Sequence, residues 1–277
     1  MVQIGTYNKM KIDRVTKSGA FLTDGTPGEK GVLLPGAQIP DGAAVGDSLE
    51  VFIYRDSEDR PIATTKKPLV TLGQAAVMKV VQVNDIGAFL DWGLDKDLLL
   101  PFKEQRWKVR PGAEVFAALY TDKSGRLCAT MLVDRFLSAD SPYKKDDTVT
   151  GILYEINRDI GGFVAVDGKY FGLIPREEIT RAHRPCMSVT ARVARVRSDG
   201  KLVLDPRKKA YKQMEDDAES VMALIDRYGG KLPFTDKADP EYIKLMTGLT
   251  KNAFKRAVGR LYKEGRIVIN DKTIEKI

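Results

Sequence analysis

Aromatic and basic side chains in the third quarter of the chain have the types and spacing that bind unpaired nucleobases. Phe163 and Phe171 flank the dipeptide Asp167-Gly168, and Lys169 follows that dipeptide directly. A base stacked on an exposed aromatic ring is worth about 1–3 kcal/mol, and nearby cations hold the phosphate backbone. These residues are therefore the first candidates for contact with single-stranded nucleic acid.

Strand alternation predicts which of these side chains face outward. If Val164 and Val166 face a core, then Phe163 and Ala165 face away from it, and the partner strand directs Phe171 to the same outer side. We expect Phe163 and Phe171 to form one exposed platform with Lys169 nearby. The alternative is that these rings pack between neighbouring domains.

The strand, turn, strand pattern that positions these residues occurs three times. Asp-Gly tolerates the positive φ angles of a two-residue hairpin turn. The copies begin at Gly19, Gly87 and Gly161 and end at Pro35, Pro101 and Pro175. In each copy a turn residue follows 11 residues after the proline and a last strand 28 residues after it. This constant spacing predicts one small fold used three times.

Each repeat contains five short strand-like runs, which favours an OB-type β-barrel. We place the barrels at residues 1–69, 70–137 and 138–210. The length variation falls in one hairpin loop, residues 26–30 of the first repeat. Residues 133–146 contain a Ser-Ala-Asp-Ser-Pro run that favours turns, and we interpret them as a linker.

After Pro206 the hydrophobic period changes from two to about 3.6 residues, which predicts helices. An apolar stripe over residues 221–228 ends at a Gly-Gly pair, and Asp239 and Thr250 are expected to cap two further helices. Two short strands after Gly265 complete a winged helix at residues 211–277. The predicted fold is therefore multidomain and mainly β, with three tandem barrels followed by an α+β winged helix.

The last predicted helix has one apolar face and one basic face. At 100° per residue, Phe254, Ala257, Val258 and Leu261 share the buried side. The opposite side carries Lys255, Arg256, Arg260 and Lys263, with Lys251 at its margin and Gly259 in mid-helix. These cations are candidates for contact with phosphates, and the alternative is an ordinary charged solvent face.

Net charge is distributed unevenly along the chain. The total is +7, of which residues 138–210 contribute +4 and residues 211–277 contribute +2. Arg192 and Arg195 lie on one predicted strand of the third barrel, where they are candidates for binding a polyanion. The alternative is a barrel edge that charges protect from association with other edges.

Other classes of protein find little support in the sequence. No apolar run is long enough to span a bilayer, and no basic start leads into an apolar segment, so we expect a cytoplasmic protein with no membrane partner. With one histidine and two cysteines, we expect no metal site, no disulfide framework, no cofactor and no enzymatic activity. We favour a monomer.

The repeated motifs resemble the RNA-binding S1 domain, and three of them before a winged helix resemble the conserved virulence factor B family of bacterial RNA-binding proteins. The resemblance implies that the second aromatic of a D-F-G-x-F motif, here Phe21, Phe89 or Phe163, stacks on RNA. Residues 18, 86 and 160 lack the first aromatic of that motif, and prolines replace its usual histidine. An architectural role for the first two barrels is therefore an alternative.

Together these patterns predict a non-catalytic protein that binds single-stranded RNA through its third barrel and winged helix. We expect a role in post-transcriptional regulation of gene expression. Two alternatives stay open. One is a winged-helix transcriptional regulator that binds duplex DNA, and the other is a scaffold whose barrels bind protein.

Overall fold

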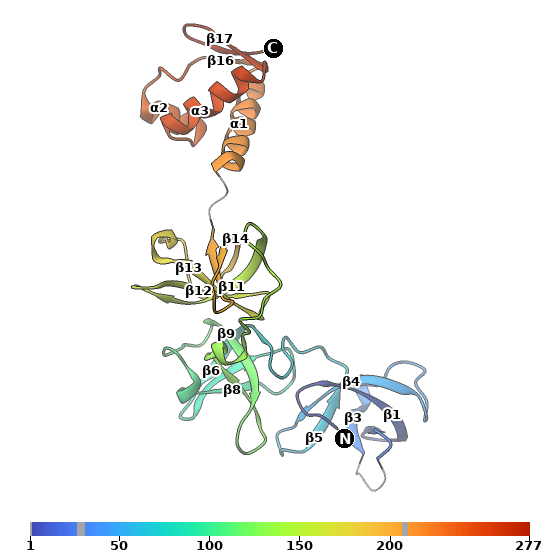
Figure 1. The fold of residues 1–277 in the computed structure, drawn as a ribbon. Helices are drawn as coiled ribbons and strands as arrows, with labels where there is room; N and C mark the ends of the chain where they lie inside the picture. The colour runs from blue at the N-terminus through green and yellow to red at the C-terminus, as the bar shows by residue number, and fades with distance from the viewer. Residues whose placement is uncertain (1, 27–30, 207–209) are drawn as a thin grey trace. The chain divides into compact units, whose positions relative to one another are not determined.

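The computed structural model describes residues 2–26, 31–206 and 210–277 of the chain (Figure 1). The chain divides into two compact units, Met1–Pro206 and Arg207–Ile277. The first contains three β-barrels and the second contains three helices with a small sheet. Most of the predicted hairpin loop, residues 27–30, lies outside the described residues.

The first barrel closes in the strand order β1-β2-β3-β5-β4. Its strands are β1 (Tyr7–Thr16), β2 (Gly19–Thr23), β3 (Val32–Pro35), β4 (Ser48–Arg55) and β5 (Pro61–Thr64). All neighbours are antiparallel except β3 and β5, whose parallel pairing closes the barrel. The short 3-10 helix η1 (Gly36–Gln38) follows β3.

The second and third barrels repeat this plan. The second barrel consists of β6 (Ala75–Val83), β7 (Gly87–Asp91), β8 (Leu98–Pro101), β9 (Glu114–Thr121) and β10 (Leu127–Thr130). The third barrel consists of β11 (Thr148–Asn157), β12 (Gly161–Val166), β13 (Tyr170–Pro175), β14 (Ser188–Val196) and β15 (Leu202–Asp205). The third barrel is closed, whereas the second is a five-stranded sheet with β8 and β10 at its two edges. Helices η2 (Phe102–Glu104) and η4 (Arg176–Glu178) follow β8 and β13. The prediction of three five-stranded barrels is confirmed.

A glycine begins the second strand of every barrel because the backbone there lies against the next strand. Gly19, Gly87 and Gly161 have φ angles of 142°, 158° and 134°. A Cβ atom on these residues would lie 2.0, 2.3 and 2.1 Å from the carbonyl oxygens of Leu34, Leu100 and Ile174. A side chain cannot be placed there without moving a strand, which accounts for the glycine in each repeat.

Successive barrels of the first unit share apolar contacts. Phe52 and Tyr54 of the first barrel belong to the core of the second, where Trp92 packs edge-on against both rings at 5.8 and 6.2 Å. Phe116 of the second barrel stacks on Tyr154 of the third at 6.4 Å. Each barrel therefore buries part of the outer face of its neighbour.

The segment predicted to be a linker takes part in the second of these contacts. Helix η3 (Val133–Phe136) lies in it, and Val133 is completely buried beside Phe116 and Tyr154. Ser138 pairs with Tyr170 of β13. The interpretation of residues 133–146 as a linker alone is therefore incomplete, because this segment also seals the junction between two barrels.

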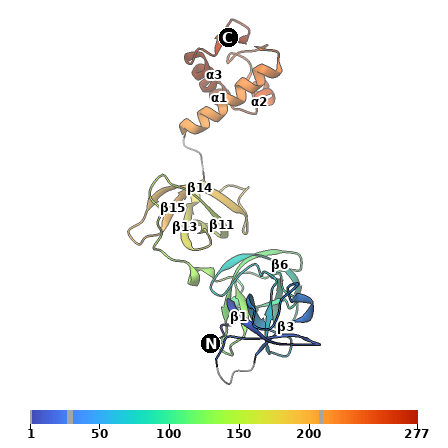
Figure 2. The same cartoon turned by 90° about the vertical axis from the view of Figure 1, so that its right-hand side faces the viewer.

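The C-terminal unit is a winged helix. It contains α1 (Ala210–Arg227), β16 (Lys231–Leu232), α2 (Pro240–Thr247), α3 (Lys251–Lys263), β17 (Ile267–Ile269) and β18 (Ile274–Lys276). Asp239 and Thr250 accept hydrogen bonds from backbone amides of α2 and α3, as their predicted capping roles require. Figure 2 shows the three helices packed together, around a common apolar core. Strand β16, which was not predicted, pairs with β18 and adds a third strand to the wing.

Across the described ranges of the chain, no helix combines the length and the apolar character that crossing a membrane requires.

We predict that Gly19→Ala destabilises the first unit by about 3 kcal/mol or more, at the upper end of the cost of overpacking. The added methyl group would meet the Leu34 carbonyl oxygen at 2.0 Å. Urea unfolding, followed by the fluorescence of Trp92 and Trp107 together, measures the effect. Gly36→Ala is the matched control, because its Cβ would have no neighbour closer than 3.8 Å and we expect a change within about 0.5 kcal/mol. Equal stability of the two variants would contradict the explanation given for the repeated glycine.

Candidate nucleic-acid interface

The hairpin of β12 and β13 places the predicted aromatic residues on one outer face. Its turn has φ angles of 52° at Asp167 and 68° at Gly168, as the Asp-Gly pair predicts. Phe163 pairs with Leu173, and Ala165 pairs with Phe171, so Phe163 and Phe171 lie diagonally on the same side of the sheet. The predicted orientation away from the barrel core is therefore confirmed.

The prediction that this face forms one exposed platform is wrong. Ala165 is completely buried and Phe163 is half-buried, because Phe116 and neighbouring residues of the second barrel cover this part of β12. The Phe163 ring packs 6.2 Å from that of Tyr154. Alternation predicts which way a side chain leaves its own barrel, but not whether a second barrel lies there.

Phe171 lies at the other end of the hairpin and is half-buried. The Lys201 ammonium group lies 4.7 Å from the centre of the Phe171 ring, within the range of a cation–π contact. Lys169 is exposed in the adjoining turn. Lys201 was missed by the sequence reasoning, although it follows directly after an Asp-Gly turn between two strands, where an exposed cation is common.

The two arginines of β14 have different surroundings. Arg192 donates hydrogen bonds to Asp146 at 2.8 Å and Asp205 at 2.9 Å, so its guanidinium group is already paired with two carboxylates. This engagement argues against Arg192 as a phosphate ligand. Arg195 lies at a register shift of β14 and is exposed.

The equivalent phenylalanines of the first two barrels also differ from each other. Arg14 lies 4.3 Å from the centre of the Phe21 ring. Phe89 is half-buried and lines a cavity. Of the three positions at which the resemblance predicts a stacking ring, Phe21 is covered by a cation, Phe163 packs in a junction, and Phe89 borders an open space.

Helix α3 has the two faces that its sequence predicts. Phe254, Ala257, Val258 and Leu261 are all buried in the core of the C-terminal unit. Lys255, Arg256 and Lys263 are exposed on the other side, and none of the three has an ion-pair partner among the described residues. A free, exposed cation is able to contact a phosphate without first breaking an internal ion pair.

Two of the predicted cations of α3 are engaged within the unit. Arg260 donates to Glu264 at 2.7 Å, and this hydrogen bond lowers the pKa of Glu264 below its ordinary value. Lys251 donates to the Ala238 carbonyl oxygen at 2.9 Å. Glu264 therefore partly neutralises the C-terminal end of the basic face.

Gly259 interrupts the same helix without an internal packing reason. A Cβ atom there would have no neighbour within 4 Å. Since glycine in a helix costs up to about 1 kcal/mol relative to alanine, Gly259 makes α3 less stable than an alanine at this position would.

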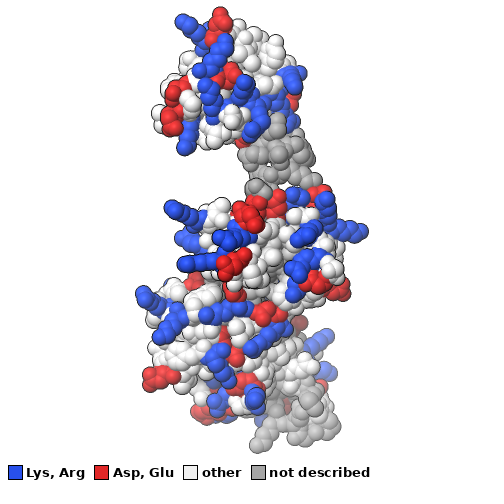
Figure 3. All heavy atoms as spheres, turned by 60° about the vertical axis from the view of Figure 1, so that its left-hand side comes forward, with Lys and Arg blue, Asp and Glu red and all other residues white. Residues whose placement is uncertain are grey.

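Figure 3 shows basic side chains interspersed with acidic ones over the barrels, while several basic side chains gather on the visible face of the C-terminal unit. The barrels therefore present individual cations rather than one continuous basic surface.

Comparison with known proteins agrees with this architecture. A family model described as an S1 domain matches residues 4–66 and 72–132, and one described as a CvfB-like winged helix domain matches residues 219–275. The uncharacterized protein YitL of Bacillus subtilis is 32% identical over 95% of this chain and 90% of its own. Conserved virulence factor B of Staphylococcus saprophyticus is 28% identical over 84% of this chain and 81% of its own. The chain belongs to the conserved virulence factor B family.

One solved structure aligns with nearly the whole chain. It is described as a multidomain protein with nucleic acid binding domains from Streptococcus pneumoniae, and it is 24% identical, with a TM-score of 0.49 and coverage of 99% of this chain and 98% of that one. The S1 and winged-helix domains of members of the conserved virulence factor B family such as this one indicate nucleic-acid binding.

We predict that the two arginines of β14 respond oppositely to removal. Arg192→Ala breaks two charge-assisted hydrogen bonds and should lower the free energy of unfolding by about 1–3 kcal/mol, with little effect on affinity for single-stranded RNA. Arg195→Ala should leave stability unchanged and reduce the slope of log affinity against log salt by about 0.7. Urea unfolding and fluorescence anisotropy at several salt concentrations measure the two effects. An Arg192→Ala protein that is fully stable but binds RNA weakly would reverse these assignments.

Proposed function

We propose that this protein binds single-stranded RNA without catalysing a reaction and acts in post-transcriptional control in the cytoplasm. The observation that carries the proposal is the outer face of α3, where Lys255, Arg256 and Lys263 are exposed and have no ion-pair partner among the described residues. Neutralisation of phosphates by such cations releases condensed counterions and drives binding.

The third barrel supplies a second surface in this proposal. Phe171 offers a half-buried ring beside Lys201, and Lys169 and Arg195 provide exposed cations. Phe163 contributes only the part of its ring that the second barrel leaves uncovered. One stacked base and a few phosphate contacts give modest affinity per barrel, so several contacts along a strand are needed for tight binding.

Single-stranded RNA is the favoured partner because OB-type barrels bind unpaired bases on an aromatic outer face. Absence of catalysis is proposed because S1 and winged-helix domains typically bind nucleic acid without chemistry of their own. The free cations of α3 also favour a second candidate function, binding of duplex DNA, since winged helices place a helix in the major groove.

We predict that the variant Lys255→Ala/Arg256→Ala/Lys263→Ala binds single-stranded RNA about tenfold more weakly at 0.15 M salt, with a salt slope lower by about 2. Anisotropy titrations of the full chain with a labelled RNA oligonucleotide give both quantities. Because all three side chains are exposed, the thermal unfolding of the variant should match that of the unaltered protein.

The matched control removes the same charge from the first barrel. Lys9→Ala/Lys11→Ala/Lys17→Ala neutralises three exposed cations of β1 and the turn that follows it, and we expect its affinity to change less than twofold. Equal losses in both triple variants would show that only net charge matters. Tighter binding of a duplex DNA of the same length would instead favour the DNA-binding alternative.

A further inference from the structure

A cavity of about 310 Å³ lies where the first two barrels meet. One side is the β4–β5 hairpin of the first barrel, and the other comes from β7, β8 and β10 of the second and their connecting turns. This volume lies at the lower end of the range for small-molecule sites, about 300–1,000 Å³. The cavity belongs to neither barrel alone.

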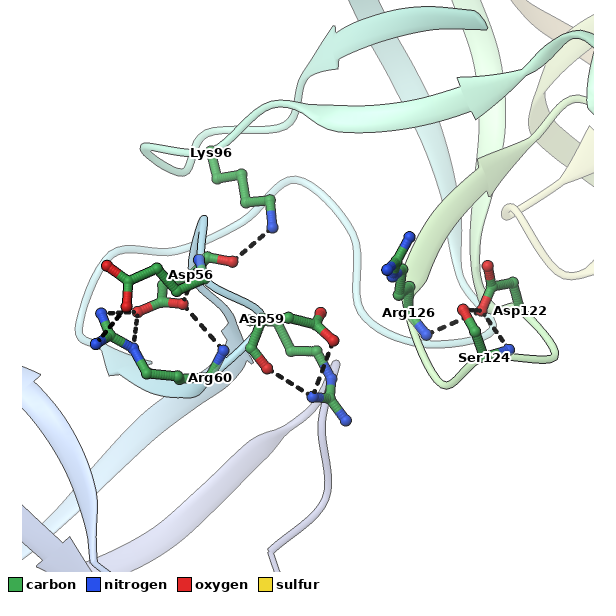
Figure 4. Close-up of polar contacts among 9 residues, drawn as sticks. Asp56, Asp59, Arg60, Lys96, Asp122, Ser124 and Arg126 are labelled. Carbon is green, nitrogen blue, oxygen red and sulfur yellow. Dashed lines mark hydrogen bonds and ion pairs between the residues drawn. The ribbon is translucent and has the colours of Figure 1, made fainter. Parts of the chain in front are cut away.

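The walls of the cavity are held together by contacts between the barrels. The Lys96 ammonium group donates to the Asp56 carbonyl oxygen at 2.6 Å, and Trp92 packs edge-on against Tyr54. Figure 4 shows the hairpin turn with Asp56 and Asp59 facing the turn with Asp122 and Arg126. A Cβ atom on Gly125 of that second turn would lie 3.8 Å from Nη2 of Arg55. The two turns are thus close enough to hold one small ligand.

One buried polar group of the cavity lining has no hydrogen-bond partner among the described residues. This group is the Nε of Arg55, although the Nη1 of the same side chain donates to the Asp59 carbonyl oxygen at 2.7 Å. Tyr54, only 6% exposed as a residue, also lines the cavity. Buried polar groups are normally hydrogen-bonded, because an unpaired one costs about 1–3 kcal/mol. The Nε of Arg55 would gain a partner from a polar ligand in this cavity.

The lining combines an aromatic ring with separated charges. Phe89 provides the ring, and Leu99 and Leu127 provide apolar surface beside it. Arg126 has no ion-pair partner among the described residues, and Asp97, which precedes β8 of the same barrel, has none either. Burial, followed by the charge of Asp91, raises the pKa of Asp97. Burial also raises the pKa of Tyr54, ahead of the charges of Asp95 and Asp56, so its hydroxyl group keeps its proton at neutral pH.

We propose that this junction cavity is a nucleotide-binding site. The base would stack on Phe89 with its polar edge toward Tyr54 and Asp97, and the phosphate would lie beside Arg126. A flat heterocycle with donors and acceptors on its edge and one phosphate group matches a lining of one ring, a hydroxyl group, a carboxyl group and the unpaired cation of Arg126, whereas Arg55 is already paired with Asp59 at 3.6 Å. The nucleotide is either a free mononucleotide or one unit of a bound strand, and only the latter case rests on the proposed function.

Calorimetric titration of the full chain tests the site. AMP, GMP, CMP and UMP are the free probes, inorganic phosphate is the probe for a site that binds only the anion, and a single-stranded RNA oligonucleotide is the strand probe. We expect one nucleotide to bind per chain and Arg126→Ala to weaken it about tenfold. Phe89→Ala should have a similar effect. Tyr54→Phe keeps the packing of the buried ring and tests the hydroxyl group alone. Arg110→Ala removes an exposed cation of the same barrel that does not line the cavity, and serves as the control.

Each outcome decides the proposal. Mononucleotide binding that is lost in the cavity variants and kept in the control supports a site for free nucleotides. If no mononucleotide binds but the cavity variants bind RNA tenfold more weakly, the site accepts a unit of a strand. Binding of inorganic phosphate as tight as that of any mononucleotide would overturn a nucleotide site. If the cavity variants change the binding of neither mononucleotides nor RNA, the nucleotide site is overturned as well. If RNA binding is lost only in the triple variant of α3, the result concerns the proposed function and not the cavity.

Discussion

The structure of the first unit depends on apolar contact between successive barrels. A small barrel with a core of about ten buried side chains, such as those of the first and third barrels here, buries little surface by itself. Phe52 and Tyr54 extend the core of the second barrel into the first, and Phe116 stacks on Tyr154 of the third. The same contacts decide which outer faces stay accessible to a ligand, so stability and binding are linked through the barrel junctions.

This link explains how one repeated position acquires three surroundings. Phe21, Phe89 and Phe163 leave their barrels in the same direction, since each follows the close-packed glycine of its repeat by two residues. The surroundings of the three rings differ: Phe21 lies under the side chain of Arg14, Phe89 borders a cavity, and Phe163 packs against the second barrel. The repeat fixes the direction of the ring, and the neighbouring barrel determines its availability.

The features that were predictable from the sequence are those set by local physics. Strand periodicity, the positive φ angles of the Asp167-Gly168 turn and the caps of α2 and α3 depend on residues close together in the chain. The burial of Ala165 and the ion pairs of Arg192 were not predictable, because their partners come from other strands or another barrel. The cavity was missed for the same reason: Tyr54 and Arg126 are far apart in the chain, and no local pattern marks them as neighbours.

Local pairing of charges says more about binding than the charge of a whole domain. The third barrel has the larger basic excess, yet Arg192 is neutralised by two carboxylates. The first two barrels are nearly neutral in total, yet Arg126 borders a cavity without a partner among the described residues. A paired cation must give up its carboxylate before it meets a phosphate, and the energies of the two contacts then largely cancel. An unpaired cation beside a partly enclosed ring has no such cost, so a pair of barrels with almost no net charge is still able to offer a site to an anionic ligand.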